Sequence, residues 1–130
     1  MSANILLVED NWIAAEVVCT VLESRGHTVM LATTGRQAME WISSRHYDLI
    51  LLDLMLPDVD GAQLVQILRR LPGCKQMPIL AFSAFVSRLE DLQRKGSQFD
   101  AYIAKPVEPE DLIRVIETHL TPTPVSSLVS

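Results

Sequence analysis

The sequence has few of the features that mark membrane, secreted and nucleic-acid-binding proteins. No apolar run approaches the roughly 20 residues of a membrane-spanning helix. The N-terminus lacks the basic stretch and apolar segment of a secretory signal. The chain carries 11 Lys and Arg against 16 Asp and Glu, so its formal net charge is −5, whereas binding to a phosphate backbone favours a basic surface. We therefore expect a cytoplasmic protein that binds neither a membrane nor nucleic acid directly.

Cysteine and histidine are scarce as well. The two cysteines, Cys19 and Cys74, have no CxxC or Cys/His spacing, and in a cytoplasmic protein they are predicted to be free, reduced thiols. The three histidines, His27, His46 and His119, do not follow the ends of predicted strands. A transition-metal site built from thiol or imidazole ligands is therefore not expected.

The composition is that of a folded domain: 130 residues, of which 48% are apolar and 21% charged. Five short apolar runs are continuous rather than alternating, which is typical of strands that are covered on both faces. These runs are Ile5–Val8, Val29–Ala32, Leu49–Leu52, Ile79–Phe82 and Tyr102–Ala104.

Segments with helical periodicity separate these runs. They cover residues 12–25, 35–45, 61–71, 87–96 (where the pattern is weak) and 109–120. In the first segment, an apolar stripe of Ile13, Val17, Val21 and Leu22 is predicted to face the core, and Gly26 stands where a left-handed residue ends a helix. Strands that alternate with helices through right-handed crossovers make a parallel sheet with helices on both faces, so we predict one α/β domain.

Side chains of complementary chemistry follow four of the predicted strands. In an open parallel sheet, ligands bind beyond the carboxyl ends of the strands. Three carboxylates, a hydroxyl and an ammonium stand there: Glu9, Asp10, Asp53, Ser83 and Lys105. Oxygen ligands without thiol or imidazole favour a hard divalent cation, Mg²⁺ first. Asp53 ends the central strand and is the best candidate for a nucleophile that attacks phosphorus and forms an acyl phosphate. Lys105 and Mg²⁺ would balance the charge, and Ser83 would donate to a phosphoryl oxygen.

Each of these side chains also has a plain structural interpretation. Asp10 is a candidate N-cap for the helix that follows, Ser83 a candidate turn residue, and Lys105 a candidate residue of an ordinary surface loop. Their coincidence at four strand ends on one edge favours the functional interpretation. Asp58 and Asp60, in contrast, are predicted to be turn and cap residues rather than catalysts.

Four motifs lie in these regions: ILLVEDN at 5–11, DLILLDLMLPDVDG at 48–61, PILAFSA at 78–84 and DAYIAKPVEPEDL at 100–112. Together they resemble the receiver (phospho-acceptor) domain of two-component response regulators. The resemblance implies a doubly wound, flavodoxin-like sheet of five parallel strands in the order 2-1-3-4-5, flanked by five helices. We expect a receiver domain over residues 1–120, and the Pro-, Ser- and Thr-rich residues 121–130 are predicted to be a flexible tail or linker.

The resemblance also implies roles for individual residues. Asp53 would be the phosphorylated aspartate. Asp10 would ligate Mg²⁺ together with Asp53 and the backbone carbonyl of Met55, while Glu9 would act through metal-bound water. Lys105 would pair with the phosphoryl group and would be followed by a cis peptide bond.

In the family, phosphorylation draws a hydroxyl inward, an aromatic ring follows, and the surface of the fourth helix, fifth strand and fifth helix changes. Ser83 and Tyr102 occupy these switch positions, although Tyr102 also fits an ordinary amphipathic residue near the surface. The implied partners are a histidine kinase or histidine phosphotransfer protein that donates from phosphohistidine, a downstream target protein, and a second copy of the chain in a homodimer. Such a domain is not an enzyme, beyond assisting its own phosphotransfer and autodephosphorylation.

Some positions depart from the commonest family pattern. Trp12 stands where many members have proline, and local packing of its ring is favoured over narrowed access to the acid pair or contact with a partner. Met55 and Ala84 hold positions that tune the lifetime of the phosphoryl group in the family, and neither offers a polar group to orient attacking water. We expect the acyl phosphate to persist for minutes or longer.

Two other classes of protein fit parts of the pattern. A Mg²⁺-dependent phosphohydrolase with an aspartyl nucleophile commonly has a second carboxylate two residues later, where this chain has Met55, which cannot transfer protons. A flavin-binding domain of similar topology needs a phosphate-binding loop rich in Gly, Ser or Thr, and the loops after the first and third strands lack one. A receiver module of a hybrid kinase or larger regulator is an open alternative to a stand-alone regulator.

Overall fold

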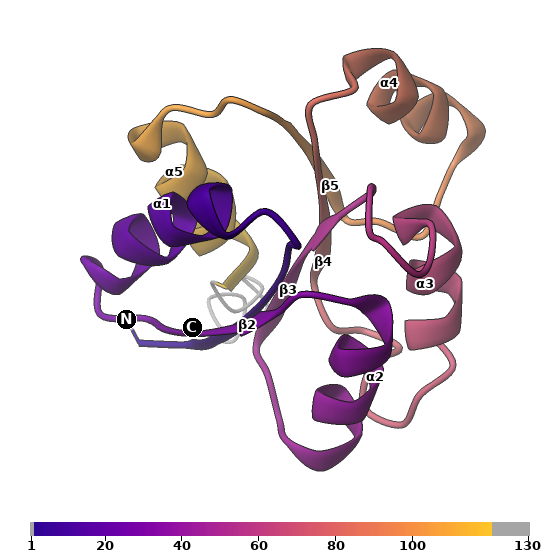
Figure 1. Cartoon of the computed structure of the whole chain (residues 1–130), viewed down its shortest axis with the longest axis horizontal. Helices are drawn as coiled ribbons and strands as arrows, with labels where there is room; N and C mark the ends of the chain where they lie inside the picture. Colours follow the sequence, from indigo (N-terminus) through magenta and orange to yellow (C-terminus); the bar gives the residue numbers. More distant parts are fainter. Residues whose placement is uncertain (1, 121–130) are drawn as a thin grey trace, which may run out of the picture.

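The computed structural model describes residues 2–120, so the predicted tail at 121–130 lies outside the described residues. Five parallel strands form one sheet in the predicted order, β2-β1-β3-β4-β5 (Figure 1). The strands are β1 (Asn4–Val8), β2 (Thr28–Ala32), β3 (Leu49–Asp53), β4 (Ile79–Ser83) and β5 (Ala101–Ala104). Each strand is one residue longer than the apolar run that predicted it. In β3 and β4 the added residue is the last one, Asp53 or Ser83, so both belong to the rigid sheet.

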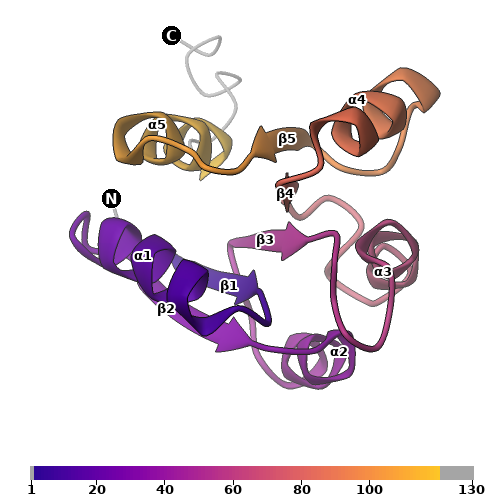
Figure 2. The same cartoon turned by 45° about the horizontal axis from the view of Figure 1, so that its top comes forward.

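Five helices cover the two faces of the sheet. They are α1 (Trp12–Glu23), α2 (Gly35–Ser44), α3 (Gly61–Leu68), α4 (Val86–Lys95) and α5 (Pro109–Leu120). Helices α1 and α5 pack on one face, and α2, α3 and α4 pack on the other (Figures 1 and 2). Among residues 2–120, none of the helices combines the length and apolar character needed to cross a bilayer.

The central strands are buried on both sides. In β1, Leu6 and Val8 join the core under α2, α3 and α4, whereas Ile5 and Leu7 join the core under α1 and α5. All residues of β3 and β4 are buried, and each large aliphatic side chain contributes roughly 1.5–3 kcal/mol on burial. The continuous apolar runs are explained by this two-sided burial, which also fixes the point at which each strand leaves the core.

The core-facing stripe predicted for α1 is wrong at two positions. Ile13 and Val17 are 61% and 59% exposed, while Ala15, Val18 and Leu22 are buried. Apolar side chains lie on more than one face of this helix, so periodicity alone does not identify the inner one. Contact with the sheet and with α5 decides which face is buried.

Four helices end earlier than predicted, α2 and α4 by one residue and α1 and α3 by two or three. Helix α1 ends at Glu23 and α3 at Leu68. Beyond these points the backbone tightens, because the N–H of Gly26 donates to the carbonyl of Glu23 (3.0 Å) and the N–H of Leu71 to that of Leu68 (3.0 Å). Such bonds across three residues mark the last, tighter turn of a helix. Gly26 has φ 89°, the left-handed conformation predicted for it.

Asn11 caps α1, so the alternative interpretation of Asp10 as the N-cap is wrong. The side-chain oxygen of Asn11 accepts hydrogen bonds from the N–H groups of Ile13 (3.0 Å) and Ala14 (3.2 Å). Asn satisfies these first donors of a helix as well as Asp does. The helix therefore takes its cap from Asn11, and Asp10 stays exposed at the edge of the sheet.

Both cysteines are free thiols, as predicted. Burial is the first cause of a raised pKa at Cys19 and at Cys74. A raised pKa keeps a thiol protonated and lowers its reactivity. The two cysteines therefore act as small core or near-core residues.

Candidate functional site

The predicted site residues meet at the carboxyl edge of the sheet. Strands β1 and β3 lie side by side, with Val8 opposite Leu52, so the next residues, Glu9 and Asp53, emerge as neighbours. Carboxylate oxygens of Glu9, Asp10 and Asp53 all lie within 4.8 Å of one another. In the part of the chain that the structure describes, these three form the group of acidic, Cys and His side chains that could hold a metal ion.

Lys105 reaches this acidic cluster from the end of β5. Its ammonium donates hydrogen bonds to Glu9 and to Asp53 Oδ2, the latter at 3.2 Å. The sheet fixes the backbone of the lysine, because its N–H donates to the carbonyl of Ser83 (2.8 Å). The peptide bond to Pro106 is cis, as the family resemblance implies. Four separate strands thus bring the acids, the hydroxyl and the ammonium together.

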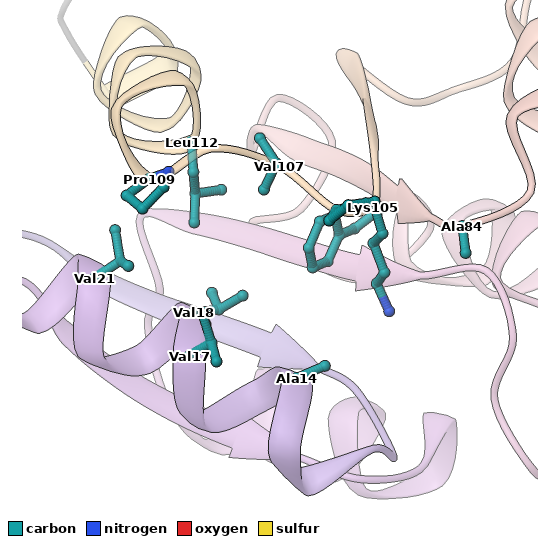
Figure 3. A pocket seen from close by; sticks show the side chains of 11 residues that line it. Ala14, Val17, Val18, Val21, Ala84, Lys105, Val107, Pro109 and Leu112 are labelled. Carbon is teal, nitrogen blue, oxygen red and sulfur yellow. The ribbon is translucent and has the colours of Figure 1, made fainter.

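An apolar groove between α1 and α5 lies beside Lys105 (Figure 3). Its volume is about 380 Å³, and its walls include Val17 of α1 together with Val107 and Leu112. Lys105 stands at one end with its nitrogen directed away from Val107 and Leu112 (Figure 3), and its ammonium lies 4.7 Å from the centre of the Phe82 ring. Apolar packing around the aliphatic stem therefore directs the charge towards the acids.

One ammonium does not balance three carboxylates. Glu9 is 1% exposed, and the pKa of its carboxyl is raised to about 7. Burial is the first cause and the hydrogen bond with Asp53 the second, while Lys105 offsets them in part. A divalent cation is the partner that would allow all three acids to ionise together. The charge balance of the site therefore fits Mg²⁺.

The loop of residues 54–60 returns to the end of β3. Asp53 Oδ1 accepts a hydrogen bond from the N–H of Met55 (3.0 Å), and Met55 pairs with Asp60 in an isolated antiparallel bridge. A Cβ atom on Gly61 would lie 2.6 Å from the carbonyl oxygen of Asp53. Glycine is therefore required for this close return of the loop, which keeps the backbone of Met55 beside Asp53.

Asp58 and Asp60 are cap residues, as predicted. Asp60 caps α3 by accepting from the N–H of Ala62 (2.8 Å). Asp58 caps a different helix, α2, by accepting from the N–H groups of Gly35 (2.9 Å) and Arg36 (3.0 Å). These donors hold the pKa of Asp58 below its ordinary value. The contact with α2 joins residues more than twenty positions apart, so local sequence does not reveal it.

The predicted switch residues lie on neighbouring strands. Ser83 is fully buried, and its Oγ accepts a hydrogen bond from the N–H of Phe85 (3.0 Å), which leaves the hydroxyl proton for another acceptor. Tyr102 is half-buried and its hydroxyl forms a hydrogen bond with Ser97. Its ring packs edge-on against Phe99, with 5.9 Å between centroids. The tyrosine is thus held by the loop between α4 and β5.

Exposed apolar side chains around the acids were not predicted. Trp12, Met55 and Phe85 are 67%, 51% and 54% exposed. The expected local packing of Trp12 is therefore wrong, because most of its ring lies in solvent. All three residues follow predicted strand ends within four positions, which is the sequence signal that could have indicated them.

An open parallel α/β sheet with acids, a lysine and a serine at its carboxyl edge is the arrangement of a phosphoryl-accepting signalling domain. Residues 5–117 match the family described as the response regulator receiver domain, and the chain belongs to that family. The family places it among the regulatory domains of two-component signalling.

Two curated relatives show different settings for such a domain. The chain is 29% identical over 129 residues to the signal transduction histidine-protein kinase BarA of Escherichia coli (strain K12), covering 99% of this chain but only 14% of BarA. It is 27% identical over 120 residues to the polar-differentiation response regulator DivK of Brucella abortus (strain 2308), covering 92% of this chain and 98% of DivK.

Solved structures of receiver domains are similar along most of the chain. The receiver domain of the sensor histidine kinase PA1611 from Pseudomonas aeruginosa PAO1, which has a magnesium ion coordinated in its active-site cleft, has a TM-score of 0.83 and 30% identity. That match covers 92% of this chain and 98% of the other. A CheY-like receiver domain from Methylobacillus flagellatus has a TM-score of 0.82 and 33% identity, covering 92% and 99%.

Proposed function

We propose that Asp53 is the residue of this receiver domain that accepts the phosphoryl group, with phosphohistidine of a histidine kinase or histidine phosphotransfer protein as donor. The observation that carries the proposal is the position of its carboxylate. It ends a fully buried strand, lies 3.2 Å from the ammonium of Lys105 and belongs to a cluster of three acids. A rigidly held carboxylate beside a cation is suited to nucleophilic attack on phosphorus.

The cofactor of this proposal is Mg²⁺. Asp10, Asp53 and the backbone carbonyl of Met55 would hold the ion directly, and Glu9 would hold it through water. Hard oxygen donors, and a cluster of three acids that a single ammonium balances only in part, support this assignment. Bound Mg²⁺ would supply positive charge to the oxygens of the transferred phosphoryl group.

The remaining residues of the site have separate tasks. A carboxylate oxygen of Asp53 forms a bond to phosphorus, the P–N bond of phosphohistidine breaks, and the imidazole leaves with the bonding electrons and takes up a proton. Lys105 exchanges one of its carboxylate partners for a phosphoryl oxygen. Ser83 donates its hydroxyl proton to another phosphoryl oxygen, since its Oγ already accepts from the backbone.

The output of the proposed switch is a change at the surface of α4, β5 and α5. A new hydrogen bond from Ser83 to the phosphoryl group draws the hydroxyl towards Asp53, and Tyr102 exchanges its hydrogen bond to Ser97 for a more buried position. The altered surface then binds a downstream target protein or a second copy of the chain. A few charge-assisted contacts are sufficient to bias such a two-state element.

The setting of the domain is also part of the proposal. We place the receiver domain in residues 1–120, in the cytoplasm, and assign residues 121–130 as a tail or linker. Stand-alone regulators such as DivK and kinases such as BarA are both represented among its relatives. The proposed chemistry is the same in either setting, because the donor needs access only to the carboxyl edge.

Beryllofluoride, which mimics an acyl phosphate, tests the acceptor assignment. With MgCl₂ and beryllofluoride we expect large NMR shifts at the amides of Ser83 and Tyr102 in the wild type and none in Asp53→Asn. Asp111→Asn is the matched control, because Asp111 pairs with Arg114 on α5, and it should behave as the wild type does. Shifts that persist in Asp53→Asn, or a wild type that does not respond, would overturn the proposal.

A further inference from the structure

The tip of the loop between β3 and α3 is attached to the start of α2. Both carboxylate oxygens of Asp58 are used, one accepting from the N–H of Gly35 (2.9 Å) and the other from the N–H of Arg36 (3.0 Å). These N–H groups belong to the first turn of α2, where no earlier turn supplies acceptors for them. The carboxylate therefore ties two elements that are distant in sequence.

Gly35 provides the space for this attachment. A Cβ atom on Gly35 would lie 2.3 Å from Cγ1 of Val59 and 3.3 Å from Cδ2 of Leu64. The backbone of Gly35 is not in the left-handed region, so the position requires a small residue rather than an unusual conformation. A side chain there would overlap the side chain of Val59, which is β-branched and close to the backbone, so the tip of the loop would have to move to make room.

The same loop contains Met55, whose backbone carbonyl is the proposed Mg²⁺ ligand. The N–H of Met55 donates to Asp53, and Met55 is bridged to Asp60 across the base of the loop. The bridge leaves four residues, 56–59, between its two ends, so the tip at Asp58 and Val59 is only three to four residues from Met55. In so short a loop, moving the tip also moves the carbonyl of Met55.

We infer that Asp58 and Gly35 are positioning residues for the magnesium site: their contact holds the loop so that the carbonyl of Met55 stays on the same edge as Asp10 and Asp53. The inference rests on the proposed function, because it concerns the ion assigned there. Groups that orient metal ligands commonly change metal affinity roughly 10- to 100-fold when they are removed. By reciprocity, a protein that breaks the contact between Asp58 and the start of α2 would weaken Mg²⁺ binding, and Mg²⁺ would weaken the binding of that protein.

Gly35→Ala tests the inference without altering any charge. We expect Mg²⁺ to bind at least about tenfold more weakly, in line with other groups that orient metal ligands, as measured by NMR titration with MgCl₂. The double variant Gly35→Ala/Val59→Ala removes the atom that the new methyl group would meet, so it should recover most of the affinity. A folded Gly35→Ala protein that binds Mg²⁺ as the wild type does would overturn the inference.

Asp58 is tested with two substitutions of equal charge. Asp58→Asn keeps one acceptor oxygen for α2, whereas Asp58→Ala keeps none. If Asp58 positions the loop, Asp58→Ala binds Mg²⁺ several-fold more weakly than Asp58→Asn. Equal affinities in the two variants would show an effect of charge alone and would contradict a positioning role. This pair also decides the matter if Gly35→Ala does not fold.

The wild type distinguishes this inference from the proposed function. A wild-type protein that neither binds Mg²⁺ nor responds to beryllofluoride contradicts the proposed function itself. A wild type that does both, beside Gly35 and Asp58 variants of unchanged Mg²⁺ affinity, contradicts only the positioning role. Thermal unfolding of each variant without Mg²⁺ confirms that a loss of affinity belongs to folded protein.

Discussion

The two edges of the sheet treat ionised groups in opposite ways. At the carboxyl edge, burial and a neighbouring acid raise the pKa of Glu9 to about 7, although Lys105 is in contact with it. At the opposite end of the strands, where they begin (the amino edge), Glu117 of α5 accepts hydrogen bonds from Arg25 (3.0 Å to each oxygen) and lies 3.1 Å from His27. These partners lower the pKa of Glu117 to about 2.

At the amino edge the charged and polar groups pair with one another. The N–H of Ala3 donates to Nδ1 of the buried His27 (3.2 Å), so the proton of the neutral imidazole is on Nε2, which faces Glu117. Arg25 occupies both oxygens of that carboxylate. Here the charges stabilise the folded chain. At the carboxyl edge, negative charge exceeds positive charge until a cation binds, which is the arrangement of a binding site rather than of a structural contact.

The largest effect is expected for a substitution that removes phosphorylation at the carboxyl edge and leaves the fold intact. Asp53→Asn should abolish phosphorylation by acetyl phosphate and MgCl₂, because an amide is not a nucleophile towards phosphorus. It should also unfold at no lower temperature than the wild type without Mg²⁺, because one of the repelling acids is removed. Intact-mass spectrometry and thermal unfolding measure the two effects. Phosphorylation of the variant at the wild-type level would exclude Asp53 as acceptor.

The next largest effect is a pH dependence of the folding stability that arises from Glu9. Its pKa rises from an ordinary value of 4.5 to about 7 on folding, so between these values the folded chain binds more protons than the unfolded chain. Stability should therefore fall as the pH rises through this window, by roughly 3 kcal/mol in total. Melting temperatures in EDTA, measured from below to above the window, test this expectation.

Glu9→Gln is the matched variant for that measurement. It should remove most of the pH dependence, whereas Asp10, Asp53 and Lys105, which face the same position, are unchanged. Mg²⁺ should stabilise the wild type more at the upper end of the window, since the ion competes with the proton. An identical slope in Glu9→Gln and wild type would assign the pH dependence to another group.

Much of the carboxyl edge could be predicted from the sequence because its residues end buried strands. Asp53 and Ser83 directly follow apolar runs, and right-handed crossovers bring the ends of parallel strands to one edge. The contact of Asp58 with α2 and the exposure of Ile13 depend on which distant surfaces meet. No local pattern contains that information, so neither could be predicted. The contact between Arg25 and Glu117 at the amino edge was not predicted for the same reason, since the two residues lie 92 positions apart.

A smaller effect is expected for the lifetime of the phosphoryl group. Met55 is half-exposed beside Asp53 and has no polar group to orient water. The wild-type half-life should be minutes or longer, and Met55→Asn should shorten it about tenfold, which corresponds to ~1.4 kcal/mol in the barrier. Decay is followed after removal of acetyl phosphate, with Met55→Leu as the control that keeps the slow rate. A wild-type half-life of a few seconds would contradict the prediction.

The smallest effect should come from the amino edge, and it should separate stability from function. Glu117→Gln removes the carboxylate charge that Arg25 and His27 share, so the melting temperature should fall by a few degrees at neutral pH. Because the folded pKa of Glu117 lies near 2, below its ordinary value of 4.5, its contribution is complete above 4.5 and is lost as the pH falls towards 2. The difference between variant and wild type should therefore shrink in acid.

Phosphorylation of Glu117→Gln by acetyl phosphate should proceed at the wild-type rate, because the amino edge lies at the opposite end of the strands from Asp53. Asp91→Asn on α4, whose carboxylate pairs with Lys95, is the control for removing an acid from an exposed ion pair. A slower phosphorylation in Glu117→Gln alone would mean that the two edges are coupled through α5. The contrast between them would then be one of degree, and the closed contacts of the amino edge would form part of the switch.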